Sequence, residues 1–277
     1  MPNQINSIFW KLRENKQTLN ILCDFYNEKV LYDLSKTGHN FFVLPPTNKY
    51  EWNNLYRKKP DNICLLKKTE ELFFNFTEYA FDLFINFANK SKGIVFHLGI
   101  PKLNNKDFIG IDTDLFSPSE DKNDLCIYVN GGFKFDVNEF DLVSEQLELV
   151  VVDDNTRLSF NKLLNLYKTS SIYLNFSKEE KISISMLEAM SCGCVPIAYG
   201  TKENQKIITH GENGFLYTSV VDMVNITKRV LGSKDFLKRM SINSRNSIIK
   251  SFSFEDYKKN WNECFYSTIE MNWWEIL

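Results

Sequence analysis

The sequence predicts an α/β protein with two parallel β-sheets, each covered by helices on both faces. Strand-like apolar runs alternate with helix-like segments along most of the chain, which is the pattern of parallel strands joined by crossover helices. A polar stretch at residues 101–124 interrupts this alternation and predicts a domain boundary. With 277 residues, 43% of them apolar, the chain can form a sizeable core in two modest domains.

The first half carries the smaller of the two series. Helices are expected at residues 27–37, which end at Gly38, and at residues 69–90. Four strands are expected at residues 20–25, 39–44, 61–66 and 93–98. Because about four strands are few for such a sheet, we expect a reduced N-terminal domain.

The second half carries a longer alternation of strands and helices. Its expected strands are residues 125–130, 147–152, 171–176, 195–199 and 214–217. Its expected helices are residues 138–145, 158–168, 185–191, 220–231, 234–252 and 254–272. We divide the chain into an N-terminal domain at 1–110, a C-terminal domain at 111–260 and a terminal helix at 261–277, which is apolar enough to pack back on the first domain.

The composition indicates in which compartment the protein is expected and which partners it can bind. The six cysteines lie in apolar stretches without zinc-site or disulfide spacing, so we expect buried thiols in a reducing environment. Residues 1–16 lack the features of a signal peptide, and no segment is apolar enough for a membrane span. We expect a cytoplasmic protein, and its net charge of −2 neither demands nor excludes a polyanionic partner.

The most informative segment, residues 173–217, carries two carboxylates at a defined spacing. Seven residues separate Glu180 from Glu188, and both lie between an expected strand and the end of a helix closed by Gly193. Open α/β sheets bind ligands at the carboxyl ends of their strands, and a helix that starts near residues 183–185 favours a phosphate. Carboxylates beside such a phosphate site can accept hydrogen bonds from sugar hydroxyls, so the segment suits a sugar nucleotide.

A structural interpretation of the same residues stays open. Ser185 and Glu188 have the spacing of a capping box, in which Glu188 only bonds back to the start of its own helix. Glu180 would then be an ordinary loop carboxylate.

Two motifs in this chain resemble one known family. The run ISMLEAMSCGCVPIAYG at residues 184–200, with Glu180 before it and HGENGFL after it, resembles the donor-binding signature of retaining glycosyltransferases of the GT-B type, in particular family 4. GIDTDLFSP at residues 110–118 resembles the inter-domain segment of that family. The resemblance implies two Rossmann-like domains that face each other across a cleft.

The resemblance also implies roles for individual residues. Glu180 would contact the transferred sugar near its anomeric carbon, and Glu188 would hold the ribose of the nucleotide. The donor diphosphate would lie at the start of the helix, close to Lys181, Ile182, Ser183, Ile184 and Ser185.

The chain departs from the family pattern at several positions. Family members commonly carry an Arg and a Lys after the first strand of the second domain, whereas here Gly131, Gly132 and Lys134 follow that strand. Lys134 is therefore the expected diphosphate ligand. Lys181 replaces a usual Gly and Lys206 a usual acidic residue. These changes leave the donor open, with a UDP-sugar as the first expectation.

One histidine and one pair of aspartates lie outside these motifs. His97 would act from the first domain near the donor sugar, and a structural histidine is the alternative. Asp153 and Asp154 do not have the spacing of a metal-binding DxD motif, so no metal and no other cofactor is expected.

The implied reaction moves a hexose from a nucleotide diphosphate to an acceptor hydroxyl with retention at the anomeric carbon and without a metal. In similar enzymes the leaving diphosphate helps to deprotonate the acceptor, so the protein mainly positions reactants and neutralises charge. The expected acceptor is a glycan or a lipid-linked glycan.

Three alternatives remain open at this point. A phage-type enzyme would instead glycosylate hydroxymethylated pyrimidines in DNA, a possibility permitted by Trp52, Tyr56 and the basic runs at 57–59 and 67–68. The missing Arg permits a catalytically silent sugar-nucleotide binder. An epimerase of the same architecture gains little support from three scattered histidines.

Overall fold

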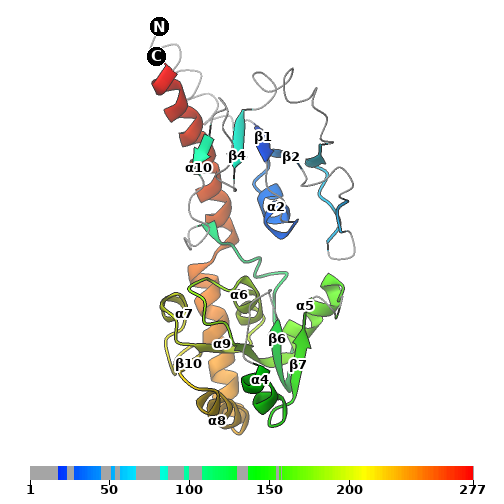
Figure 1. Cartoon of the computed structure of the whole chain (residues 1–277), viewed down its shortest axis with the longest axis vertical. Coiled ribbons are helices and arrows are strands. Elements are labelled where there is room, and N and C mark those ends of the chain that lie inside the picture. Colours follow the sequence, from blue (N-terminus) through cyan, green and yellow to red (C-terminus); the bar gives the residue numbers. More distant parts are fainter. Residues whose placement is uncertain are drawn as a thin grey trace. The chain divides into compact units, whose positions relative to one another are not determined.

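The chain divides into two compact units, one made of Met1–Gly110 with Glu255–Leu277 and the other of Ile111–Phe254. A computed structural model describes residues 18–23, 28–44, 51–53, 57–66, 82–86, 97–99, 108–129, 137–153, 156 and 158–276. Each unit contains a five-stranded parallel sheet, so the predicted α/β class is confirmed (Figure 1).

The first sheet has the strand order β3-β2-β1-β4-β5. Its strands are β1 (Asn20–Cys23), β2 (Asn40–Val43), β3 (Ile63–Leu65), β4 (Leu83–Asn86) and β5 (His97–Gly99). All neighbouring pairs are parallel, in a Rossmann-like order that reverses direction between β1 and β4. Because each strand has only three or four residues, this sheet is small, as the reduced N-terminal domain predicts.

Strand β4 corrects the helix expected at residues 69–90. Leu83 and Ile85 are buried in the sheet between β1 and β5, and a short apolar run of this kind fits a buried strand as well as a helix. Asp82 holds the strand in register, because its Oδ2 accepts the Asn20 N–H at 2.7 Å and its own N–H donates to the Asn20 carbonyl at 2.8 Å. Residues 67–81 lie outside the described residues, and so do residues 93–96 of the strand expected at residues 93–98.

Two helices complete the described part of the first unit. Helix α2 (Glu28–Ser35) buries Leu31 and Leu34, and the terminal helix α10 (Phe254–Ile276) buries Trp261 and Phe265 completely. The Phe265 ring lies edge-on to Phe41 of β2, with 6.4 Å between the centroids. The terminal helix therefore contributes to the core of the unit formed by the start of the chain.

The second sheet has the order β10-β9-β8-β6-β7, all parallel. Its strands are β6 (Asn123–Val129), β7 (Leu149–Val152), β8 (Ser170–Asn175), β9 (Val195–Tyr199) and β10 (Phe215–Tyr217). The chain moves from β6 to one edge of the sheet and from β8 to the other. The strand order therefore reverses between β6 and β8, which is the position where doubly wound sheets bind ligands.

Helices cover both faces of this second sheet (Figure 1). They are α4 (Val137–Ser144), α5 (Phe160–Thr169), α6 (Ile184–Ser191), α7 (Lys202–Ile207), α8 (Val220–Leu231) and α9 (Lys234–Ser251). Right-handed crossovers place α5 and α6 on one face and α4 on the other, and α6 accordingly packs on α5 and α9 while α4 packs on α8. Helix α7 was not predicted from the sequence.

The segment at residues 110–118 is anchored to α6 and α9. Arg245 of α9 donates to the carbonyls of Phe116 at 3.0 Å, Ser191 at 2.5 Å and Thr113 at 3.0 Å. The Ser191 hydroxyl donates to the same Phe116 carbonyl at 2.7 Å. One guanidinium thus ties the segment to the carboxyl end of α6.

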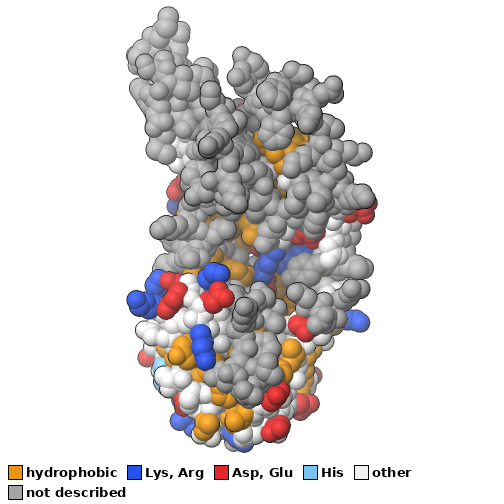
Figure 2. All heavy atoms as spheres, viewed as in Figure 1, with side chains coloured by type: hydrophobic (Ala, Val, Ile, Leu, Met, Phe, Trp, Pro, Cys, Tyr) orange, Lys and Arg blue, Asp and Glu red, His pale blue; other side chains and the backbone are white. Residues whose placement is uncertain are grey.

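The surface and the cysteines agree with most of the compositional expectations. Figure 2 shows acidic and basic side chains interspersed on the described surface in that view, as a nearly balanced charge predicts. Cys23, Cys126, Cys192 and Cys194 are buried, whereas Cys264 is half-buried and Cys64 is exposed, which corrects the expectation for these two residues. No helix in the part of the chain that the structure describes is long and apolar enough to cross a bilayer.

Candidate functional site

The candidate site lies at the carboxyl ends of β6 and β8, where the strand order of the second sheet reverses. These two strands are parallel neighbours, so the loops that follow them leave the same edge of the sheet. The loop after β8 carries Glu180 and Lys181. The loop after β6 carries Gly131, Gly132 and Lys134, which lie outside the described residues.

Side-chain hydrogen bonds to the backbone shape the loop after β8. The Asn175 Oδ1 accepts the Ser177 N–H at 3.0 Å, and the Ser177 hydroxyl accepts the Glu179 N–H at 3.2 Å. The Tyr217 hydroxyl of β10 donates to the Asn175 carbonyl at 3.2 Å. The start of the loop is therefore fixed, while Glu180 itself is exposed.

Helix α6 begins directly after this loop, with Ser183 as its N-cap. The Ser183 hydroxyl accepts the Met186 N–H at 3.3 Å. Ser185 is the second residue inside the helix, so the capping box of Ser185 with Glu188 is wrong. The N–H groups of the first turn have no acceptor inside the helix and carry the positive end of its dipole. This end of α6, with Ile182, Ser183, Ile184 and Ser185, can therefore bind an anion.

Glu188 is buried further along α6, with 3% of its surface exposed. Tyr173 of β8 is buried beside the same turn of the helix. Burial raises the pKa of Tyr173 more than its hydrogen bonds to Ser183 and Ser185 lower it, and the charge of Glu188 raises it further. Burial also raises the pKa of Tyr128 on β6 to about 12. Both phenols therefore stay protonated at neutral pH.

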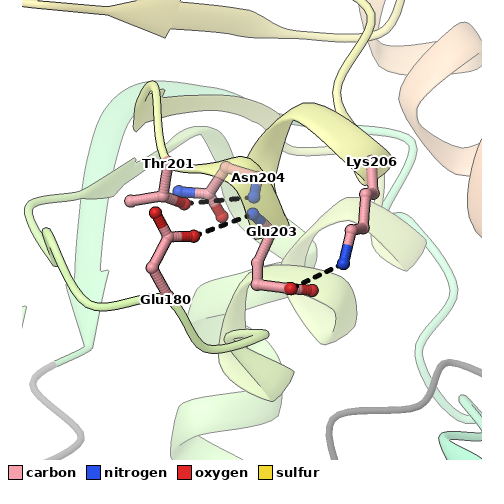
Figure 3. Close-up of polar contacts among 5 residues, drawn as sticks. All are labelled: Glu180, Thr201, Glu203, Asn204 and Lys206. Carbon is pink, nitrogen blue, oxygen red and sulfur yellow. Dashed lines mark hydrogen bonds and ion pairs between the residues drawn. The ribbon is translucent and has the colours of Figure 1, made fainter.

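Glu180 is held by a helix that the sequence did not reveal. Its Oε2 accepts the Glu203 N–H in the first turn of α7 at 3.3 Å (Figure 3). The Thr201 hydroxyl caps this helix by accepting the Asn204 N–H at 3.1 Å. Thr201, Glu203 and Asn204 are thus the residues around the site that the sequence analysis missed. The sequence did contain a pattern that predicts this helix, because Thr201 is a favourable N-cap residue and the acidic Glu203 follows in the first turn.

The two lysines that depart from the family pattern have acidic partners. The Lys181 Nζ lies 2.9 Å from Glu179, and the Lys206 Nζ lies 2.6 Å from Glu203 (Figure 3). Both lysine side chains are more than half exposed, so these ion pairs are weak and can be exchanged for a ligand.

His97, the other predicted site residue that the structure describes, belongs to a different unit from Glu180 and Glu188. His97 is the first residue of β5 and lies opposite Phe84 of β4. It belongs to the first unit, whereas the other candidates belong to the second. Within the described ranges, no three His, Cys, Asp or Glu side chains are grouped as metal ligands.

Two of the residues that permitted a nucleic-acid acceptor have internal contacts instead, although Lys58 beside them is exposed. Trp52 and Arg57 are buried, and the indole N–H of Trp52 donates to the Arg57 carbonyl at 2.6 Å. The Arg57 guanidinium pairs with Asp33 at 3.3 Å and stacks on the Tyr32 ring. These side chains are therefore not available to a phosphate backbone. Tyr56 and residues 67–68 lie outside the described residues.

Comparison with known proteins supports the family resemblance. The family model described as "Glycosyl transferases group 1" matches residues 121–247, which contain the candidate donor-side residues of the second unit. No curated protein matches the sequence.

Solved structures match almost the whole chain in fold. HepE from Anabaena, solved with UDP and glucose, has a TM-score of 0.63 at 12% identity, over 89% of this chain and 99% of that one. Sucrose-phosphate synthase from Thermosynechococcus elongatus has a TM-score of 0.62 at 11% identity, over 92% of this chain and 100% of that one. A glycosyltransferase from Rickettsia africae has a TM-score of 0.59 at 12% identity, over 91% and 99%. At these identities the matches establish the fold alone.

The family match and the fold matches thus lead to one conclusion. The family match covers the unit in which Glu180, the capped start of α6 and Glu188 lie together, and the fold matches extend over both sheets. Residues 121–247 of this chain are similar to the glycosyl transferases group 1 family, and the chain has the GT-B fold of the solved structures that it matches.

Proposed function

We propose that this protein is a retaining hexosyltransferase that uses a nucleotide diphosphate sugar, with a UDP-sugar as the first candidate. Sugar transfer from nucleotide-sugar donors is the activity of the family whose model matches residues 121–247. One observation supports the assignment to this reaction. Glu180, the Ser183-capped start of α6 and the buried Glu188 lie together where the strand order reverses. A carboxylate for the sugar, a dipole for the diphosphate and a carboxylate for the ribose follow one another along nine residues, Glu180 to Glu188.

In the proposed reaction the bond between the anomeric carbon and the diphosphate breaks, and a bond to the acceptor oxygen forms on the same face of the sugar. The acceptor proton moves to the leaving diphosphate oxygen. The start of α6, Lys181 and Lys134 neutralise the diphosphate charge, so we propose that the reaction needs no metal. Glu180 fixes the transferred sugar, and His97 is proposed to act on it from the first unit.

The proposed acceptor is a glycan or a lipid-linked glycan. The internal contacts of Trp52 and Arg57 remove part of the support for a DNA acceptor, so that alternative becomes an outcome of the acceptor assay. A silent binder would bind donor without turnover.

The test starts with thermal shifts for UDP, UDP-glucose, UDP-N-acetylglucosamine, GDP-mannose and ADP-glucose. A ligand that binds only the native state raises the melting temperature, so the panel ranks donors before the acceptor is known. Release of the nucleotide is then measured with pooled glycans or hydroxymethylated DNA, with and without EDTA. The proposal is wrong if none of the nucleotide sugars raises the melting temperature and none of them is turned over.

Glu180→Ala is the decisive variant. It should lower turnover at least 100-fold and remove the preference for the nucleotide sugar over the bare nucleotide, because the sugar loses its carboxylate contact. Glu179→Ala is the matched control, since Glu179 is the exposed neighbour and its surface pair with Lys181 is weak. Turnover near the wild-type level in Glu180→Ala contradicts the assignment.

A further inference from the structure

We propose that Thr201 is a positioning residue that sets the place of the Glu180 carboxylate. This inference rests on the proposed function, in which Glu180 contacts the transferred sugar. It adds a residue from a different part of the chain, just after β9, which acts through α7 and has no assigned contact with the donor.

The first step is the cap at the start of α7. Thr201 is buried, with 4% of its surface exposed, and has the extended backbone of an N-cap residue, with φ −67° and ψ 161°. Its hydroxyl accepts the Asn204 N–H at 3.1 Å, and its carbonyl accepts the Gln205 N–H at 3.0 Å. The threonine hydroxyl therefore holds the first turn of α7 in its helical form.

The second step links this turn to Glu180. Glu203 is the second residue of the helix, and an N–H at that position has no acceptor within the helix. In this protein the acceptor is the Glu180 carboxylate, 3.3 Å away (Figure 3). Because Glu180 is otherwise exposed in its loop, the direction of this N–H selects one position of the carboxylate among many.

The third step is the set of contacts that hold this turn. The Asn204 Nδ2 donates to the Tyr199 carbonyl at 2.8 Å, and the Gln205 Nε2 donates to the Gly200 carbonyl at 2.8 Å. Helix α7 has only six residues, too few to be stable on its own. The Glu203 Oε2 and the Asn204 Oδ1 are buried without a hydrogen-bond partner, and unpaired buried acceptors of this kind destabilise a fold. The two bonds to the Tyr199 and Gly200 carbonyls come from side-chain amides, whereas the Thr201 hydroxyl and the Glu180 carboxylate accept the N–H groups of the first turn, so the Thr201 cap orients the N–H that binds Glu180.

Three variants separate positioning from stability. Thr201→Val keeps the shape and removes the hydrogen-bond acceptor, whereas Thr201→Ser restores the acceptor. Ser219→Ala is the matched control, because the Ser219 hydroxyl caps α8 in the same unit by accepting the Asp222 N–H at 3.2 Å and has no bond to Glu180. Thr201→Gly replaces Thr201→Val if the valine variant does not fold, since glycine removes the hydroxyl at a small stability cost.

Calorimetric affinities for UDP and UDP-glucose and the rate of UDP release from UDP-glucose are the readouts. For Thr201→Val we expect UDP affinity within twofold of wild type, a roughly tenfold loss of the additional affinity for UDP-glucose and a tenfold or larger fall in kcat. Thr201→Ser and Ser219→Ala should keep all three values within twofold. A merely structural role predicts equal effects for Thr201→Val and Ser219→Ala at equal melting temperatures, and that result overturns the inference.

A double-mutant cycle tests whether Thr201 acts through Glu180. In the Glu180→Ala background, Thr201→Val should cause no further loss of UDP-glucose affinity. Additive losses would overturn the inference while leaving the proposed function intact. If wild-type protein does not prefer UDP-glucose or another nucleotide sugar over its nucleotide, the proposed function fails, and this inference fails with it.

Discussion

Two glutamates of similar chemistry have very different surroundings in this protein. Glu180 is exposed in a loop and its carboxylate accepts a backbone N–H from α7, whereas Glu188 is almost completely buried on α6. Burial of a carboxylate is unfavourable unless the group is hydrogen-bonded or serves a ligand. The pair therefore divides into an exposed carboxylate, which we propose to contact the sugar, and a buried carboxylate, which we propose to hold the nucleotide.

Glu188→Gln should weaken the binding of UDP and of UDP-glucose by a similar factor, about tenfold. Glutamine keeps the shape but loses the negative charge and one of the acceptors for the ribose hydroxyls. Glu180→Ala serves as the contrast, because it should weaken only the nucleotide sugar. Calorimetry with both ligands on both variants separates the two roles, and unchanged UDP affinity in Glu188→Gln would contradict the ribose assignment.

At the scale of the element, side-chain and glycine caps fix both ends of α6. Ser183 caps the amino end, and Gly193 closes the carboxyl end at φ +77°. The Gly193 N–H donates to the Met190 carbonyl at 2.8 Å and the Cys194 N–H to the Ala189 carbonyl at 2.9 Å, which is a Schellman motif. Ser241 of α9 then donates to the Gly193 carbonyl at 2.6 Å, so the cap is also a tertiary contact.

Gly193→Ala should destabilise the second unit more than Gly211→Ala does. Both glycines have a left-handed backbone, at φ +77° and +81°, so alanine costs about 1–2 kcal/mol of conformational strain at either site. Only at Gly193 would the new Cβ meet another group, the Ser241 hydroxyl oxygen at 2.7 Å, whereas at Gly211 nothing lies within 4 Å. We expect a further ~1 kcal/mol at Gly193. Urea unfolding of both variants measures the difference in the free energy of unfolding. Equal losses would show that Ser241 moves away from the new Cβ at no cost in stability.

At the scale of the whole molecule, the end of the chain completes the unit formed by its beginning. His39, just before β2, joins the two. Its Nδ1 accepts the Leu19 N–H at 3.1 Å, so the proton of the neutral ring lies on Nε2, which donates to the Asn262 Oδ1 of α10 at 2.8 Å. The His39 ring also lies edge-on to Phe265 and Tyr266. The terminal helix is therefore held by a neutral histidine.

The stability of the first unit should fall as the pH drops below about 6.5, the ordinary histidine value. Burial lowers the pKa of His39 in the folded protein, although Asn262 and Asp82 act in the opposite direction. The unfolded chain therefore binds a proton at higher pH than the folded one, and stability is lost from pH 6.5 down to the folded pKa, by at most about 1.4 kcal/mol per pH unit. Thermal unfolding between pH 7.5 and 5.0 measures this loss. His39→Gln should reduce the slope, and an unchanged slope in that variant would assign the loss to other groups.

Much of the second unit could be predicted because its signals are local. The expected strand at residues 195–199 and the helix at residues 220–231 agree with β9 and α8 residue for residue. Their apolar periodicity and N-cap residues lie within the segments themselves. In contrast, β4 was mistaken for helix, because a four-residue buried strand and a buried helical turn share one hydrophobic pattern and only its neighbours β1 and β5 decide between them.

The sequence by itself determined the α/β class with two parallel sheets, and the Glu180 and Glu188 motif with the start of a helix between them. The tertiary structure alone decided that Trp52 and Arg57 are internal, that Glu188 is buried rather than part of a capping box, and that Glu180 binds α7. The reason is sequence separation. Caps and periodicity act within a few residues, whereas the bonds of Glu180 to Glu203 and of His39 to Asn262 span 23 and 223 residues. Contacts of that kind exist only once the whole core has packed.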